Sequence, residues 1–424
     1  MRDHGPVTNT WEEHTYMEHL DVPQFLGLLA VMLGAAKLGG ALAQRLGQPA
    51  VLGELVAGVL LGGSVLGLVD PTTEILHLLA ELGIVILLFE IGLETDLRQL
   101  MQVGGASTLV AVVGVVLPFV LGYVTCAWLG LGPLAAVVAG VTLTATSVGI
   151  TARVLSDLHC LHEPESHIIL GAAVIDDVIG LVILAVVERL TQGHAVTGLG
   201  IFQTTAIAFG FLVGVLVLGR LVVPPLVGWA AQVDLPGTAT MLAVMVAFGF
   251  AWLASIAGSA MIIGAFAAGL LLRETPQAHE MERGVAHLGH FFVPLFFVMV
   301  GAAVDVRVLN PLEPANDQTL LIGGLLIIAA VLGKWLAGYA PFWFKGNKHI
   351  IGVGMIPRGE VGLIFAQMGL TSGVLPPGLF SAVMVMVMVT TFLAPPLLKL
   401  LVPSRPHRDQ PPEPEGIDDL VTKP

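Results

Sequence analysis

The sequence predicts an all-α polytopic membrane protein with thirteen transmembrane helices. The chain has 424 residues, of which 55% are hydrophobic and only 12% are charged, and its mean hydropathy is +0.89, which excludes a mostly water-facing surface. Apolar stretches long enough to cross a hydrocarbon core, about 20 residues each, recur from residue 23 to residue 402. The formal net charge of -13 lies largely in the two ends and the loops, so it indicates solubility and no nucleic-acid partner.

The helices are placed by their apolar runs, which end at Gly, Pro and charged residues. The first six are expected over 23–45, 49–68, 75–93, 107–129, 133–155 and 167–190. A seventh is expected over 199–220, followed by an amphipathic connector with three prolines. The last six are expected over 240–256, 258–274, 286–304, 319–344, 350–369 and 379–402.

The basic residues give the orientation, because Lys and Arg are enriched in cytoplasmic loops. With the N-terminus outside, the cytoplasmic loops and tail hold twelve basic residues and the outer segments hold three. A missed or extra helix would mix these two sets, so the separation favours thirteen helices. Residues 1–22 are then an extracytoplasmic segment without the pattern of a signal peptide, residues 23–402 form the membrane domain, and the Pro-rich residues 403–424 form a disordered cytoplasmic tail.

Thirteen helices divide into six, one and six, which indicates two inverted six-helix repeats joined by helix 199–220. Helix 133–155 contains AGVTLTATSVGI and helix 350–369 contains IGVGMIPRGEVGLI. Each of these segments interrupts an apolar run with residues that loosen a helix. Broken helices in matching positions of two repeats indicate the binding site of a transporter.

Five charged residues lie within these predicted spans. Asp176 and Asp177 occur together in GAAVIDDVIGLVILAV, Lys334 lies in helix 319–344, and Arg358 and Glu360 lie in helix 350–369. Each such charge costs about 2.5–3.5 kcal/mol on insertion scales. A structural ion-pair cluster is one explanation, but adjacent carboxylates repel each other. If Lys334 neutralises one Asp, the other acid is left to face a polar cavity.

A carboxylate in such a cavity holds either a proton or a small cation, so the two ligands compete. The sequence therefore predicts exchange of a monovalent cation, preferably sodium, for protons, with no cofactor. Thr144, Thr146 and Ser147 in the first break are candidate oxygen ligands, although hydroxyls also bond back to their own helix. Arg358 and Glu360 are expected to compensate the helix ends exposed at the second break.

Other polar residues are expected to be peripheral. Snorkelling or local pairing is expected of Lys37, Glu54, Glu90 and Glu94. Solvated positions at a loop are expected of His159, His162 and His167. The two cysteines, Cys126 and Cys160, are expected to be inert thiols, because their spacing fits neither a disulfide framework nor a metal site.

The chain resembles the monovalent cation:proton antiporter-2 family, and closely its NapA-type bacterial sodium/proton antiporters. The matching motifs, in order, are RLGQPAVLGELVAGVLLG, LGIVILLFEIGLETDL, TATSVGITARVL, ILGAAVIDDVIGL, the Lys334 helix and GVGMIPRGEVGLI. They extend from Arg45 to Leu363 and cover most of the membrane domain. Their combination and order are highly specific for the family.

This resemblance implies the NhaA/NapA-like antiporter fold, in which the two discontinuous helices cross. It implies a homodimer in the inner membrane, with dimerisation helices within 23–93 and 240–304 and a moving core within 107–190 and 319–402. The core would carry its ion across the membrane in an elevator-like motion and serve sodium and pH homeostasis.

The same resemblance assigns roles to the site residues. Asp177 would be the principal ligand of sodium and of the proton, Asp176 would be the partner of Lys334, and Thr146 and Ser147 would lie beside the site. The Asp-Asp pair is similar to that of electrogenic exchangers, which move two protons per sodium ion.

Several alternatives stay open. A potassium/proton antiporter of the same family is one, although such proteins often carry a nucleotide-binding domain after the membrane region. A cation channel needs a continuous pore, in which Lys334 would repel cations. A membrane aspartyl protease needs two acids on separate helices, whereas residues 176 and 177 are neighbours on one helix. A sensor without transport would be recognised by an attached signalling domain.

Overall fold

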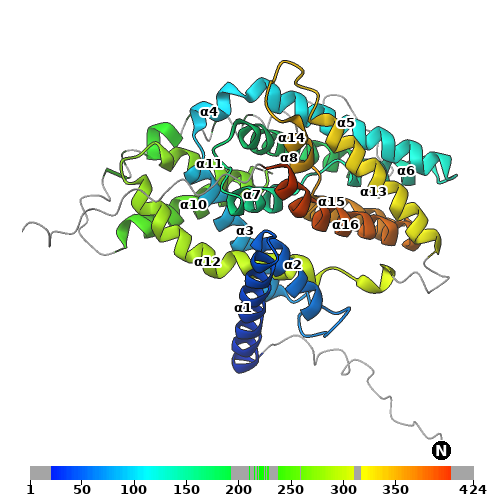
Figure 1. The fold of residues 1–424 in the computed structure, drawn as a ribbon, viewed down its shortest axis with the longest axis horizontal. Coiled ribbons are helices and arrows are strands. Elements are labelled where there is room, and N and C mark those ends of the chain that lie inside the picture. Colours follow the sequence, from blue (N-terminus) through cyan, green and yellow to red (C-terminus); the bar gives the residue numbers. More distant parts are fainter. Residues whose placement is uncertain are drawn as a thin grey trace, which may run out of the picture.

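The structure is a computed structural model that describes residues 21–191, 237–257, 259–309 and 317–402, with isolated positions between 210 and 228. In these ranges the regular secondary structure is helical, apart from one isolated β-bridge between Gly62 and Val69. The fold is therefore all-α (Figure 1).

Seven of the described helices are long and apolar enough to cross a membrane. They are α1 (Val22–Arg45), α3 (Glu74–Glu94), α5 (Gly104–Trp128), α10 (Thr238–Ile256), α12 (Ala278–Ala302), α13 (Asp317–Ala337) and α16 (Pro377–Leu401). The others are α2 (Ala50–Leu61), α4 (Leu97–Gln102), α6 (Pro133–Thr142), α7 (Val148–Asp157), α8 (Pro164–Thr191), α11 (Met261–Arg273), α14 (Lys348–Gly354), α15 (Glu360–Thr371) and the 3-10 turn η1 (Val306–Leu309).

Most of the predicted spans coincide with these helices, but two end earlier than expected, and the span predicted over 286–304 begins earlier, because α12 starts at Ala278. The second span was predicted to reach residue 68, but α2 ends at Leu61 and the chain turns back at Gly62. The eleventh was predicted to reach residue 344, but α13 ends at Ala337. The predicted helix 199–220 lies almost entirely outside the described residues, so the count of thirteen and the inverted repeats stay predictions.

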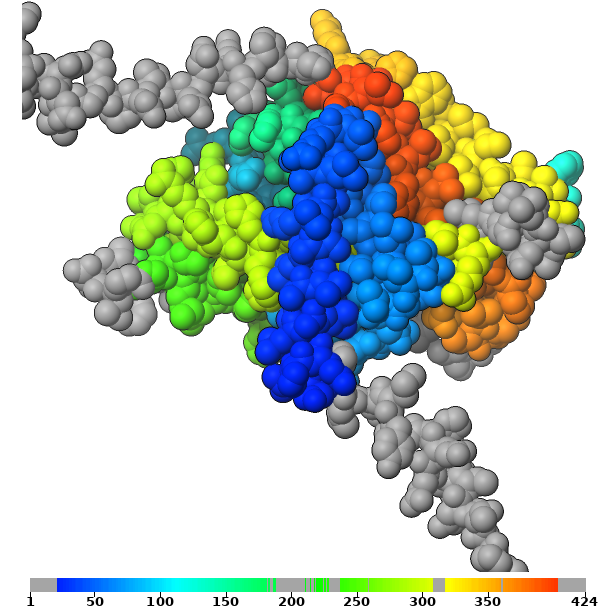
Figure 2. All heavy atoms as spheres, turned by 60° about the horizontal axis from the view of Figure 1, so that its bottom comes forward, coloured from blue at the N-terminus to red at the C-terminus, as the bar shows by residue number. Residues whose placement is uncertain are grey.

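The helices pack in two groups. The first group consists of α1, α2, α3, α10, α11 and α12, and the second consists of α5, α6, α7, α8, α13, α14, α15 and α16. In Figure 1 α1 projects from the bundle beside α2, and Figure 2 shows it lying along the surface. Leu26, Val31, Leu38 and Leu42 of α1 are exposed, as expected of a helix that faces lipid or another protein chain.

Glycines allow the closest helix crossings within the first group. A Cβ on Gly269 of α11 would lie 2.7 Å from the Cα of Gly92 on α3. A Cβ on Gly301 of α12 would lie 2.9 Å from the Cα of Gly58 on α2. Small residues at such crossings let backbones approach, and this close packing supplies much of the association energy between helices in a membrane.

Replacing Gly269 by Val is expected to lower the melting temperature in detergent, because the side chain has no space between α11 and α3. Overpacking of this kind typically costs about 1–3 kcal/mol. Gly249→Val in α10 is the matched control, since no atom lies within 4 Å of a Cβ placed there. Equal melting temperatures for the two variants would contradict the proposed tight crossing.

Candidate ion-binding site

Two helices of the second group are broken at the positions that the sequence predicted. The backbone leaves the helix between α6 and α7 at residues 143–147, and between α14 and α15 at residues 355–359. The two breaks lie against each other: the Ser147 N–H donates to the Pro357 carbonyl at 2.8 Å, and the Thr146 hydroxyl donates to the Met355 carbonyl at 3.2 Å. A Cβ on Gly359 would lie 2.7 Å from Ser147 Oγ, so this contact requires glycine.

Arg358 lies at the junction of the two breaks and is completely buried. Its Nη1 donates to the carbonyl of Ala145 at 3.0 Å and to that of Met355 at 3.5 Å, and its Nη2 donates to Ala330 O at 3.5 Å. The first two carbonyls follow the C-terminal ends of α6 and α14, where the helix dipoles favour a cation. The guanidinium thus lies where its positive charge can offset the negative ends of the α6 and α14 helix dipoles. The Glu360 side chain is outside the described part of the chain, so its predicted role stays a prediction.

Asp176 and Lys334 form a buried ion pair between α8 and α13. Lys334 Nζ lies 3.0 Å from Asp176 Oδ2, and the two side chains are 0% and 1% exposed. Gly114 on α5 provides the space for the lysine, because a Cβ there would lie 3.3 Å from Nζ. Such a pair is stable only while both partners are present, since each charge alone would be desolvated without compensation.

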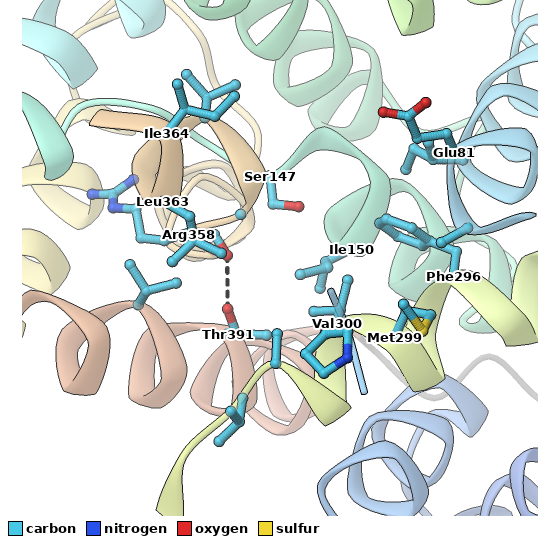
Figure 3. Close-up of a pocket in the computed structure, with 18 of the residues that line it drawn as sticks. Glu81, Ser147, Ile150, Phe296, Met299, Val300, Arg358, Leu363, Ile364 and Thr391 are labelled. Carbon is cyan, nitrogen blue, oxygen red and sulfur yellow. Dashed lines mark hydrogen bonds between the residues drawn. The ribbon is translucent and has the colours of Figure 1, made fainter. Parts of the chain in front are cut away.

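Asp177, the neighbouring acid, lines a cavity between the two helical groups. The cavity has a volume of about 660 Å³ and is also lined by Gly180 of the second group. Ser147 and Ile150 of the same group line it as well (Figure 3). Asp177 and Ser147 are 6% and 5% exposed. The cavity extends to Pro71, which precedes α3, and so reaches the end of the bundle where α3 begins. One of the two adjacent acids is therefore neutralised by a lysine, and the other faces a cavity.

At the opposite end of α3 the two groups are joined by a polar contact. Arg153 Nε lies 3.2 Å from Asp157 Oδ1 on α7, and Asp157 Oδ2 accepts a hydrogen bond from Val51 N in the first turn of α2 at 3.3 Å. Glu54 follows one turn later and is only 3% exposed. Snorkelling or local pairing was expected for Glu54; the snorkelling position is wrong, because α1 and α7 cover the start of α2, and local pairing stays a prediction.

A second expectation is also wrong. His167 was expected to be a solvated loop histidine, but it is 2% exposed. It lies in the first turn of α8, which begins at Pro164, and therefore packs among helices. His159 and His162 are exposed as predicted, and both cysteines are free thiols in buried positions.

Two threonines that the sequence did not single out hold the breaks in place. Thr391 of α16 donates its hydroxyl to the Arg358 carbonyl at 2.7 Å (Figure 3), and Thr151 of α7 donates to the Gly354 carbonyl at 2.7 Å. The signal for Thr391 was a Thr-Thr pair within an apolar run. Thr144, by contrast, bonds back to Val141 O at 2.8 Å, which is the ordinary role of a helix hydroxyl.

Taken together, the helical membrane bundle, the paired breaks and the buried acids are typical of an ion-coupled secondary transporter. Residues 30–402 match the sequence family of transmembrane sodium/hydrogen exchangers, so the chain belongs to this family. The resemblance inferred from the motifs is confirmed.

Relatives over nearly the whole chain carry antiporter names. The chain is 41% identical over 448 aligned positions to the high-affinity Na(+)/H(+) antiporter NhaS3 of Synechocystis, covering 97% of both proteins. It is 35% identical to the Na(+)/H(+)-K(+) antiporter GerN of Bacillus cereus, covering 89% of this chain and 96% of GerN. The glutathione-regulated potassium-efflux protein KefC of Escherichia fergusonii is 32% identical over 72% of this chain, which spans 49% of that relative. These relatives are transporters and not enzymes.

The fold has also been seen in a solved structure. The sodium proton antiporter MjNhaP1 of Methanocaldococcus jannaschii superposes with a TM-score of 0.69 at 17% identity, covering 90% of this chain and 96% of that one. The similarity supports the fold. The protein is therefore a multi-pass membrane protein of an antiporter family.

The buried pair can be tested by its effect on stability. Lys334→Gln is expected to lower the melting temperature strongly, because breaking a buried pair costs about 3–5 kcal/mol. The double variant Lys334→Gln/Asp176→Asn should recover much of the loss, since neither charge is then left alone. Lys345→Gln, at an exposed position, is the control. A double variant no more stable than Lys334→Gln would contradict the pairing.

Proposed function

We propose that this chain exchanges sodium or lithium ions for protons across the membrane, with Asp177 as the group that binds them alternately. The observation that carries the proposal is the unequal environment of two adjacent acids: Asp176 pairs with Lys334, while Asp177 lines the cavity. A carboxylate at such a place binds a proton or a small cation but not both. Occupancy by one ligand therefore requires release of the other.

The helix breaks supply further oxygen atoms for the cation. The Ser147 hydroxyl lines the same cavity as Asp177, and unwound backbone offers carbonyls of the kind that hold sodium in other transporters. Thr146 is bonded to the opposite break, so it orients the backbone of the site. Arg358 offsets the partial charges of the two helix ends through its hydrogen bonds to Ala145 O and Met355 O.

Alternating access would come from movement of the second helical group past the first. The cavity lies between the two groups and reaches one end of the bundle, while the Asp157 contact to Val51 closes the other end. An elevator-like motion of the core, carrying Asp177 from one side to the other, would open each side in turn. We propose a homodimer formed by the first group, whose helices α1 and α10 expose many apolar side chains, with the N-terminus outside.

We also propose electrogenic exchange, because the Asp176–Asp177 pair is similar to that of exchangers that move two protons per sodium ion. The exchange of potassium is the second candidate, because GerN is named for sodium and potassium, and KefC for potassium.

Asp177→Asn is expected to abolish exchange while expression and melting temperature stay close to those of the wild type. The measurement is proton flux in proteoliposomes with a pH-sensitive dye, after addition of sodium, lithium, potassium or choline. Sodium or lithium should release protons in the wild type and not in the variant, whereas a response to potassium alone would assign the second candidate function. Asp317→Asn, at an exposed position at the start of α13, is the control. Wild-type flux in Asp177→Asn would place the site elsewhere.

The hydroxyls at the first break are expected to contribute less to sodium binding than Asp177 does. Thr146→Ala and Ser147→Ala should each raise the apparent sodium constant about fivefold, which corresponds to one hydrogen bond of about 1 kcal/mol. Thr144→Ala is the control, because its hydroxyl donates back to the Val141 carbonyl in the last turn of α6. If all three variants had the wild-type constant, the breaks would not belong to the cation site.

A further inference from the structure

The cavity that holds Asp177 has a second carboxylate on its opposite wall. Glu81 lies on α3, two turns after the helix begins, and lines the cavity together with Ser147 and Asp177. Figure 3 shows Glu81 and Phe296 on the side of the cavity that faces Ser147. Glu81 belongs to the first helical group and Asp177 to the second, so the two acids face the same space from elements that are separate in the fold.

The surroundings of Glu81 favour an electrostatic effect on cations. The walls between Glu81 and the helix breaks are largely apolar, and include Ile84, Phe296 and Met299. Charges of one sign in a cleft with low-dielectric walls focus the field and raise the local concentration of the opposite ion. Arg358 also lines the cavity, but its guanidinium points away from it (Figure 3) and donates to backbone carbonyls.

The remaining ionisable groups at the cavity are at its mouth. His77, one turn before Glu81, has Nδ1 3.6 Å from Glu81 Oε1. Asp305, which follows α12, also lines the cavity and accepts a hydrogen bond from Arg307 N at 3.0 Å. Both His77 and Glu81 are substantially exposed, with 62% and 42% of their side chains accessible. The acid is therefore not needed to fill or cross-link the core.

We propose that Glu81 recruits the transported cation: its carboxylate draws sodium into the cavity and lowers the apparent sodium constant on the side to which the cavity opens. The inference rests on the proposed exchange at Asp177 and adds a residue that acts before binding. Because α3 lies in the first group, Glu81 stays on its own side when the second group moves. Its effect is therefore restricted to one side of the membrane.

The test compares Glu81→Gln with Glu74→Gln in oriented proteoliposomes. Glu74 lies in the first turn of the same helix and is exposed, but it is not among the residues that line the cavity. With sodium added on the cavity side at low salt, Glu81→Gln should raise the apparent sodium constant about threefold without changing the maximal rate. Glu74→Gln and Glu81→Asp should behave like the wild type.

Two further readouts separate recruitment from a structural role. Added choline chloride should shrink the difference between Glu81→Gln and wild type, since screening at about 1 M salt reduces the Debye length to about 3 Å. When sodium is added on the side opposite the cavity opening, Glu81→Gln and the wild type should have equal apparent sodium constants.

Equal constants on the cavity side, or a lower maximal rate and melting temperature without a change in the constant, would overturn the assignment of Glu81. If the wild type itself shows no cation-dependent proton flux, the proposed exchange fails, and this inference fails with it.

Discussion

The structure depends on how two adjacent carboxylates are accommodated inside a membrane protein. Asp176 and Asp177 are neighbours on α8, and neither reaches the aqueous ends of the helix. Lys334 from α13 neutralises Asp176 at 3.0 Å, which leaves Asp177 to the cavity between the helical groups. The lysine reaches Asp176 past Gly114 of α5, the helix that packs against both α8 and α13. The proposed exchange at Asp177 is based on this asymmetry.

The two helix breaks also place polar groups inside the bundle, and these groups need hydrogen-bond partners. Unwinding α6 from α7 and α14 from α15 frees backbone groups inside the bundle, where unsatisfied polar groups are costly. Arg358 donates to carbonyls at both breaks, Thr391 donates to the Arg358 carbonyl, and the two breaks bond to each other through Ser147. The breaks are therefore supported as one unit beside Asp177.

Much of this arrangement could be predicted from the sequence. Hydropathy located the helices, and charges within apolar runs identified Asp176, Asp177, Lys334 and Arg358, because a buried charge is rare enough to carry information by itself.

The orientation of side chains around a helix was harder to predict. Glu54 and His167 lie near helix ends, where exposure was expected, yet neighbouring helices cover them. The role of Thr391 depends on a contact to Arg358, 33 positions earlier in the chain, and the place of Glu81 on the cavity wall depends on how the two groups meet. A single sequence contains no direct record of such distant contacts.

The central claim is that sodium and a proton compete for one carboxylate. Its most direct test is the dissociation constant of sodium for the purified protein, measured by calorimetry at a series of pH values. Competition at Asp177 predicts that, on the acidic side of its titration, the constant rises at least about tenfold for each unit decrease in pH, and that Asp177→Asn abolishes binding. A sodium constant that does not change with pH would contradict the account.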